Sequence, residues 1–221
     1  MLEKRALKLK YKAVIFDLDG VIVCTDECHY KGWKKLADEE GIYFDREINQ
    51  RLRGVSRMES LEIVLEKANK AYTAEEKAEM AERKNNFYRE YIKDLTPADV
   101  LPGVMDFCEK LRAQGVKLAI GSSSKNTPAI LKGIGLDTYF DAVADGNQIT
   151  KSKPDPEVFL LAAKLVGIAP ADCMVVEDAE AGVEAAIAGG MDVLGLGKAV
   201  ENSNATYKAS GLNTFDISNL A

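Results

Sequence analysis

Residues 12–20, KAVIFDLDG, place an apolar run directly before two acidic side chains. The run at 13–16 is rich in β-branched and aromatic residues, which predicts a strand buried on both faces of a parallel sheet. Asp17 and Asp19 follow it, although acidic side chains are rarely buried without a partner and like charges repel each other. In open α/β sheets, ligands bind outside the carboxyl ends of the strands. The segment therefore predicts either a cation-dependent active site or a solvated acidic loop.

Strand and helix patterns alternate along most of the 221 residues. Short apolar runs predict further strands at 116–120, 140–144, 174–176 and 192–196, and helical periodicity predicts helices between them. This alternation favours βαβ units. We therefore expect an α/β fold with a Rossmann-like, doubly wound parallel sheet.

One stretch, 28–94, interrupts the alternation of strands and helices, because its sequence predicts helices only. We expect it to be an all-helical cap domain inserted into the α/β core. The core domain would then comprise 1–27 and 95–221, and the chain would cross between the two domains at hinges near 23–27 and 94–97.

Composition limits the classes of partner. The net charge is −6 and no basic stripe offsets it, which argues against a general nucleic-acid binder. No apolar run reaches the ~20 residues of a membrane span, and the basic N-terminus lacks the apolar core of a secretory signal. Without such a signal we expect a reducing, cytoplasmic location. The four cysteines and single histidine do not have the spacing of a structural zinc site. A local basic pocket for a small anionic metabolite remains compatible with this composition.

Polar side chains recur where successive predicted strands end. In chain order they are Asp17, Asp19, Ser122, Lys153, Glu177 and Asp178. Oxygen-only ligands suit Mg²⁺, and a hydroxyl together with a lysine suits a phosphate group. Each residue alone has a more ordinary explanation, such as a turn hydroxyl, a surface lysine or an acid favoured at a helix start. Their recurrence at one edge of the predicted sheet makes the combined pattern a stronger indication than any part of it.

The pattern consists of DxDG after a first strand, a strand ending in serine, a Lys-Pro pair and a strand ending in Glu-Asp. It resembles the haloacid dehalogenase superfamily of phosphotransferases over essentially the whole chain. The resemblance implies that Asp17 is a nucleophile forming an aspartyl phosphate and that Asp19 is the general acid and base. Ser122 and Lys153 would bind the transferring phosphoryl group. The implied cofactor is Mg²⁺, and its ligands would be Asp17, the backbone carbonyl of Asp19, Glu177 and Asp178.

The predicted cap and the loop after Ser122 resemble, more narrowly, the sugar-phosphate mutases of this superfamily. The resemblance implies that His29 hydrogen-bonds toward Asp19 and couples cap closure to proton transfer. Arg57 would bind the distal, non-transferring phosphate of the substrate. The other implied substrate-binding residues are Trp33, Arg53, Gly54, Val55, Ser56, Ser60, Lys84 and Asn85 in the cap, and Ser123, Ser124, Lys125 and Asn126 in the core.

The implied reaction interconverts β-D-glucose 1-phosphate and glucose 6-phosphate through the aspartyl phosphate and β-glucose 1,6-bisphosphate, in a chain that we expect to be a monomer. Two alternatives stay open, namely a Mg²⁺-dependent sugar-phosphate phosphatase and a non-catalytic regulatory protein that binds phosphosugars. Three positions depart from the expected pattern: Arg53 replaces a lysine, Cys24 an acid and Ala179 a serine. The first exchange keeps the charge but changes the hydrogen-bond geometry.

Overall fold

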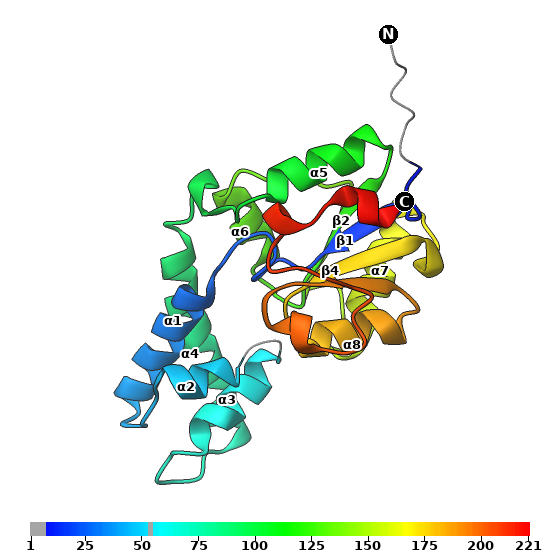
Figure 1. The fold of residues 1–221 in the computed structure, drawn as a ribbon. Coiled ribbons are helices and arrows are strands. Elements are labelled where there is room, and N and C mark those ends of the chain that lie inside the picture. The colour runs from blue at the N-terminus through cyan, green and yellow to red at the C-terminus, as the bar shows by residue number, and fades with distance from the viewer. Residues whose placement is uncertain (1–7, 53–54) are drawn as a thin grey trace.

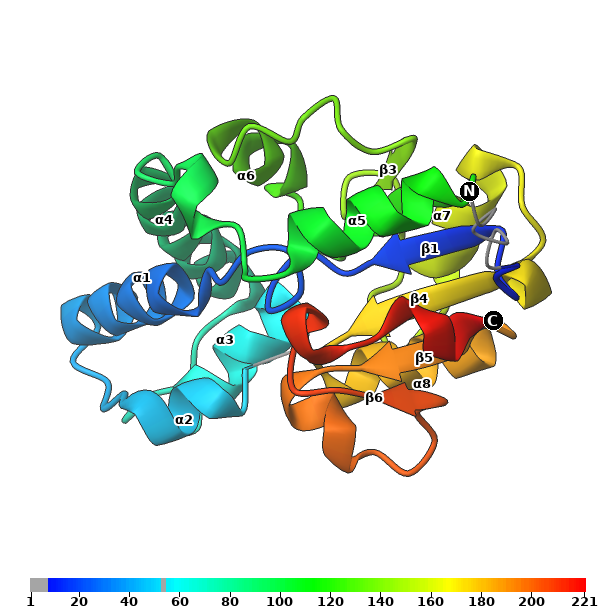
Figure 2. The ribbon, with the colours of Figure 1, turned by 45° about the horizontal axis from the view of Figure 1, so that its top comes forward.

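The computed structural model describes residues 8–52 and 55–221. Its centre is a six-stranded parallel sheet with the strand order β3-β2-β1-β4-β5-β6 (Figures 1 and 2). The strands are β1 (Ala13–Phe16), β2 (Lys117–Gly121), β3 (Ala142–Ala144), β4 (Cys173–Glu177), β5 (Asp192–Gly195) and β6 (Tyr207–Lys208). The predicted α/β class with a doubly wound sheet is confirmed.

Helices cover both faces of the sheet because its inner strands are apolar on both sides. Val14 and Phe16 of β1 belong to one hydrophobic cluster, and Ala13 and Ile15 belong to the other. Burial of a large apolar side chain stabilises the fold by about 1.5–3 kcal/mol, so these two clusters hold the core together. The first cluster is covered by α5 (Val104–Ala113) and α6 (Thr127–Gly133), and the second by α7 (Glu157–Val166) and α8 (Glu180–Ala188).

The strand register brings the carboxyl ends of the central strands together. Phe16 of β1 lies opposite both Ile120 of β2 and Val176 of β4. Asp17 and Glu177, which follow Phe16 and Val176 in the chain, therefore lie at the same edge of the sheet. Figure 2 shows these strand ends directed toward a separate group of helices.

Four helices between β1 and β2 form a helical lobe beside this edge of the sheet (Figure 1). They enclose a hydrophobic cluster of their own, in which Trp33, Leu36 and Leu61 are deeply buried. The lobe therefore has a core separate from the two clusters that flank the sheet. Its helices are α1 (Asp26–Glu39), α2 (Arg46–Gln50), α3 (Arg57–Leu65) and α4 (Ala74–Ile92).

The two lobes are joined by packing as well as by the chain. α1 begins at Asp26, slightly later than the helical spacing from Cys24 suggests, which leaves a short connection after β1. At the other end of the lobe, Tyr88 and Ile92 of α4 pack into the first hydrophobic cluster of the core. α4 therefore spans both lobes, and the domain boundaries near 28 and 94 stay a prediction.

The last part of the chain adds structure that the sequence did not predict. β6 extends the sheet at one edge, and short 3₁₀-helices follow it. Tyr207 of β6 packs edge-on against Tyr11, whose hydroxyl donates a hydrogen bond to Asp192 at 2.6 Å. Within residues 8–52 and 55–221, no helix combines the length and the apolarity that a membrane crossing requires.

Candidate active site

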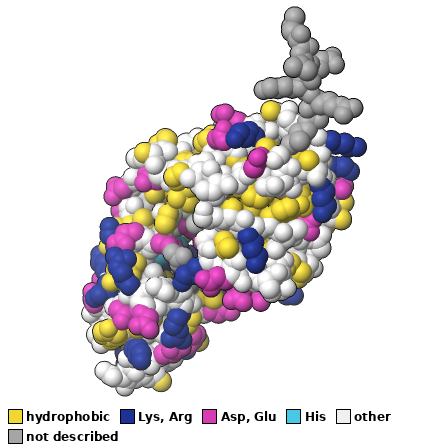
Figure 3. Space-filling view, in the orientation of Figure 1, with side chains coloured by type: hydrophobic (Ala, Val, Ile, Leu, Met, Phe, Trp, Pro, Cys, Tyr) yellow, Lys and Arg dark blue, Asp and Glu magenta, His cyan; other side chains and the backbone are white. Residues whose placement is uncertain are grey.

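A cavity of about 630 Å³ lies between the carboxyl edge of the sheet and the helical lobe. Figure 3 shows the hollow between the two lobes, with acidic and basic side chains around it. Every predicted site residue that the structure describes lines this cavity. They are Asp17, Asp19, His29, Trp33, Val55, Ser56, Arg57, Ser60, Lys84, Asn85, Ser122, Ser123, Ser124, Lys125, Asn126, Lys153, Glu177 and Asp178. Arg53 and Gly54 lie outside the described residues.

Three carboxylates meet at the sheet side of the cavity. One oxygen each of Asp17, Glu177 and Asp178 lies within 4.8 Å of the others. Lys153 Nζ donates to Asp17 Oδ1 at 2.5 Å and to Glu177 Oε1 at 2.6 Å. Only 6% of Lys153 is exposed, so its charge acts in a low-dielectric environment.

Burial sets the ionisation of this cluster. It raises the pKa of Asp17 to about 7, although the Lys153 charge opposes the shift, and the Glu177 carboxylate adds to it. Burial also lowers the pKa of Lys153, but the charges of Asp17 and Glu177 outweigh that effect and raise it overall. Lys153 thus bonds two of the three clustered carboxylates, Asp17 and Glu177. The oxygens of the three carboxylates are close enough together to share a hard divalent cation, so the donor set fits Mg²⁺.

Glycines make room for the acidic side chains. A Cβ on Gly182 in α8 would lie 1.8 Å from Glu177 Oε1. A Cβ on Gly20 would lie 2.1 Å from Asp178 Oδ2, and Gly20 also has a positive φ of 80°. The other oxygen of Glu177 accepts backbone N–H groups of Asp178 and Ala179 at 2.7 and 2.8 Å. The carboxylates are therefore held in place by backbone groups and close packing.

Asp19 is fixed by a hydroxyl that the sequence did not single out. The Thr25 hydroxyl donates a short hydrogen bond to Asp19 Oδ1, and the Tyr88 hydroxyl donates to Thr25 Oγ1 at 3.2 Å. Burial raises the pKa of Asp19, and the Thr25 hydrogen bond opposes the shift. A carboxyl whose pKa is raised can carry a proton more readily near neutral pH, which suits a general acid and base.

His29 has a different partner from the one expected. The described hydrogen bond joins its Nδ1 to Lys84 Nζ at 2.9 Å, in place of the predicted bond toward Asp19. The imidazole also packs against the Tyr88 ring, with 4.2 Å between the ring centroids and 34° between the ring planes. Burial, together with the positive charges of Lys84 and Arg57, lowers the pKa of His29 well below its usual value, so the ring is neutral and accepts from Lys84.

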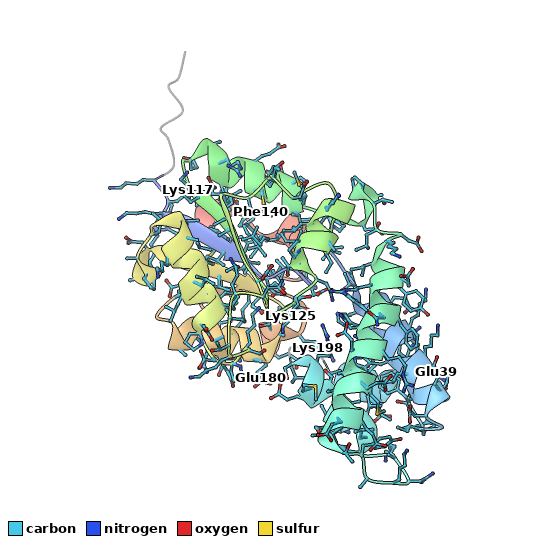
Figure 4. The ribbon with its side chains drawn as sticks, turned by 180° about the vertical axis from the view of Figure 1, so that it is seen from behind. Glu39, Lys117, Lys125, Phe140, Glu180 and Lys198 are labelled. Atoms are coloured by element: carbon cyan, nitrogen blue, oxygen red, sulfur yellow. The ribbon has the colours of Figure 1, made fainter. Side chains whose placement is uncertain are left out.

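Hydroxyl groups shape the loop after β2. Ser122 Oγ accepts the backbone N–H of Ser124, and Ser124 Oγ accepts that of Asn126, each at 3.2 Å. Buried Ser123 Oγ has no hydrogen-bond partner among the described residues. The loop therefore combines hydroxyl donors with the exposed cation Lys125, which Figure 4 labels at the seam between the core and the helical lobe.

Arg57 supplies a cation from the opposite wall. Ser56 caps α3 by accepting the N–H of Glu59 at 3.3 Å, which places Arg57 as the first helical residue. Its guanidinium lies 3.5 Å from Glu82, and 29% of its side chain is exposed. Burial lowers the pKa of Arg57, and the Glu82 carboxylate opposes this shift. The arrangement leaves a positive group on the lobe side of a cavity whose sheet side holds the acids and Lys153.

Several partners of the site residues could not be read from the sequence. Thr25, Tyr88 and Glu82 lie next to Asp19 or Arg57 only after the lobes fold. A weak signal existed for Thr25, because it lies in the polar connection six residues after Asp19. The sequence held no such signal for Tyr88 and Glu82, because both occupy ordinary positions in a long predicted helix.

The sequence and the fold are similar to those of known proteins. The model of a family described as haloacid dehalogenase-like hydrolases matches residues 11–190. A β-phosphoglucomutase of Bacillus subtilis is 46% identical over 189 residues, which cover 85% of this chain and 84% of the relative. The fructose-1-phosphate phosphatase YqaB of Escherichia coli is 32% identical and covers 84% of this chain and 96% of its own. The crystal structure of a β-phosphoglucomutase from Clostridium difficile superimposes with a TM-score of 0.85 at 38% identity, over 92% of both chains.

Proposed function

Because the chain belongs to the haloacid dehalogenase-like hydrolase family, we propose that it is a phosphomutase that interconverts β-D-glucose 1-phosphate and glucose 6-phosphate. The observation that carries the proposal is the two-sided cavity. Its sheet side holds Asp17 and Lys153, and its lobe side holds Arg57. A substrate with phosphate positions at both ends matches a site with cationic groups on both walls.

Asp17 is the nucleophile of the proposed reaction. An Asp17 oxygen attacks the phosphorus of a phosphate ester, the bond to the sugar oxygen breaks, and Asp17 becomes an aspartyl phosphate. Asp19 gives its proton to the departing sugar oxygen. Lys153, already bonded to Asp17 Oδ1, offsets negative charge on the transferring group. Mg²⁺ held by Asp17, the Asp19 carbonyl, Glu177 and Asp178 would reduce the repulsion between carboxylate and phosphate.

The second half-reaction reverses the first at the other end of the sugar. The hydroxyl of a sugar monophosphate attacks the aspartyl phosphate, Asp19 takes its proton, and Asp17 leaves as a carboxylate. Attack by the 6-hydroxyl of β-glucose 1-phosphate gives β-glucose 1,6-bisphosphate, which must turn over before Asp17 attacks the phosphate at C1. Arg57 binds whichever phosphate is not reacting, so both orientations are accepted.

The helical lobe determines which nucleophile reaches Asp17. When the lobe covers the strand ends, water is excluded and a positioned sugar hydroxyl reacts first. Contact between the lobes already exists away from Asp17, since Lys198 Nζ donates to Gln50 Oε1 at 3.4 Å. Lys198 is labelled at the seam in Figure 4.

The proposal is tested by steady-state assays on purified protein with Mg²⁺. β-Glucose 1-phosphate plus a trace of β-glucose 1,6-bisphosphate should give glucose 6-phosphate much faster than inorganic phosphate. Asp17→Asn should abolish both products. Phosphate release without isomerisation, even with the bisphosphate present, would contradict the mutase assignment.

Similarity to the E. coli phosphatase supports a second candidate, Mg²⁺-dependent hydrolysis of a sugar phosphate by the same Asp17. Here water replaces the sugar hydroxyl as the second nucleophile, and the phosphate release measured in that assay would report it. We also propose a monomer located in the cytoplasm. Light scattering during size-exclusion chromatography tests the first proposal, and cell fractionation tests the second.

A further inference from the structure

Three polar side chains form a hydrogen-bonded row across the seam between the lobes. Arg89 Nε, on α4, donates to Asn126 Oδ1 in the core at 3.1 Å. Asn126 Nδ2 in turn donates to Asn85 Oδ1, one turn before Arg89 on α4, at 3.0 Å. Asn126 and Asn85 are 6% and 3% exposed, whereas Arg89 is exposed. The row therefore leads from a surface cation to an amide that lines the cavity.

The chemistry of arginine gives this row a direction. A guanidinium nitrogen can only donate, so Asn126 must turn its oxygen toward Arg89. Its NH₂ group then faces Asn85 and can only donate, so Asn85 must offer its own oxygen. Because the Asn85 oxygen accepts this hydrogen bond, the NH₂ group of Asn85 is the part of its amide that can interact with a ligand in the cavity.

Without a donor at position 89, either orientation of Asn126 would be compatible with the bond to Asn85. Both amides could rotate together, and Asn85 would then present its carbonyl oxygen to the cavity. A carbonyl oxygen accepts hydrogen bonds and is repelled by phosphate oxygens, whereas an NH₂ group donates to them. The neighbouring charges favour an anion at this position. Burial lowers the pKa of Arg57 and the Glu82 carboxylate opposes that shift, whereas the positive charge of Arg89 is close enough to add to it.

We propose that Arg89 is a positioning residue for sugar-phosphate binding, which fixes the Asn126 amide so that Asn85 presents hydrogen-bond donors to the ligand. This inference rests on the proposed function only in that the ligand is a sugar phosphate. The same role of Arg89 applies whether the enzyme is a mutase or a phosphatase. Arg89 itself acts through Asn126 and is separate from the groups that transfer the phosphoryl group.

The test compares Arg89→Met, which removes the donor, with Arg89→Lys, which keeps a group that can only donate. Arg89→Met should raise the KM for the sugar phosphate about tenfold, the effect of losing ~1.4 kcal/mol of binding, with a smaller change in kcat. Arg89→Lys should restore most of the affinity. Lys93→Met is the matched control, because Lys93 follows α4 and pairs with Glu90 away from the cavity. Phosphorylation of Asp17 by acetyl phosphate, which has no sugar, should be unchanged in all three variants.

A double-mutant cycle separates orientation from charge. In an Asn85→Ala background, Arg89→Met should change the KM by less than twofold, because the group that it orients is gone. Full additivity of the two substitutions would overturn the positioning role and leave only a general effect of charge. An unchanged KM in the single Arg89→Met variant would overturn it as well.

Calorimetric titration of glucose 6-phosphate into Asp17→Asn protein tests the inference without turnover. The proposal predicts about tenfold weaker binding when Arg89→Met is added to this background. Equal affinities, or no measurable binding to Asp17→Asn protein, would overturn it. The steady-state product assay tests the proposed mutase reaction separately. Failure of the mutase proposal can therefore be distinguished from failure of the positioning role of Arg89.

Discussion

The Lys84 ammonium group lies 2.9 Å from Nδ1 of His29, and both side chains line the cavity, Lys84 buried and His29 half-buried. Lys84 also lies 4.8 Å from the centroids of the Trp33 and Tyr88 rings, so aromatic faces surround its charge. Burial and the Arg57 charge lower its pKa from 10.5 to about 7, although Asp19 opposes the shift. The lobe thus keeps a costly cation where its charge faces the cavity.

That cost predicts a pH dependence of stability. Between about pH 7 and 10.5 the unfolded chain holds the Lys84 proton more tightly than the folded chain. The free energy of unfolding should therefore rise with pH in this window, by at most about 1.4 kcal/mol per pH unit. Lys84→Met should stabilise the protein at pH 7 and remove this part of the slope. Urea unfolding at several pH values measures it, with the surface variant Lys77→Met as the control.

Arg57→Ala should separate isomerisation from hydrolysis. Loss of a charge-assisted hydrogen bond to the distal phosphate should lower kcat/KM for the mutase reaction about 100-fold, because such bonds contribute ~1.5–3 kcal/mol. Hydrolysis of acetyl phosphate, which has no distal phosphate, should fall less than threefold by the same reasoning. Arg51→Ala removes a surface cation of the same lobe that pairs with Glu66 and should leave both rates unchanged. If Arg57→Ala lowered the rates of isomerisation and of acetyl phosphate hydrolysis equally, this result would contradict the proposed role of Arg57 in binding the distal phosphate.

Thr25→Val should lower kcat about tenfold with little change in KM, because Asp19 loses the hydroxyl that orients it and ~1.4 kcal/mol of barrier corresponds to tenfold. Thr25→Ser keeps the hydroxyl and should retain most of the activity. Steady-state kinetics on both variants provides the measurement. Equal activity of Thr25→Val and the wild type would show that the hydrogen bond does not affect proton transfer.

Gly182→Ala should weaken activation by Mg²⁺. The added Cβ would occupy the position of Glu177 Oε1 and move that carboxylate away from Asp17 and Asp178. We expect the Mg²⁺ concentration for half-maximal activity to rise at least tenfold, since ~1.4 kcal/mol corresponds to tenfold in affinity. Gly133→Ala in α6, where the nearest atom would be 3.3 Å from the new Cβ, is the control. EDTA should abolish wild-type activity and Mg²⁺ should restore it, and EDTA-resistant turnover would contradict a metal role.

The core half of the site was predictable because a parallel sheet fixes its geometry. Once β1, β2 and β4 are recognised, the residues at their carboxyl ends must lie at one edge of the sheet, and Asp17, Ser122 and Glu177 lie there. The residue types at this edge, which are carboxylates, a hydroxyl and a lysine, indicated a site for a cation and a phosphate group. No such rule places the helical lobe against the core, since that depends on how whole helices pack.

The contacts that the sequence missed are all of this second kind. Lys84 and His29 are 55 residues apart, so their pairing could not be foreseen from spacing, and His29 was assigned to Asp19 instead. Arg89 and Asn126 are 37 residues apart and meet only across the seam between the lobes. β6 was missed for another reason: its two residues are too short for a periodic pattern.

The most direct test of the central claim is a single-turnover experiment. Protein labelled on Asp17 with ³²P-acetyl phosphate is freed of excess donor and mixed with unlabelled β-glucose 1-phosphate and Mg²⁺. If the aspartyl phosphate meets a sugar hydroxyl before water, the label should appear first in β-glucose 1,6-bisphosphate and then in glucose 6-phosphate. Appearance of the label as inorganic phosphate, at a rate that the sugar phosphate does not change, would contradict the account and identify a phosphatase.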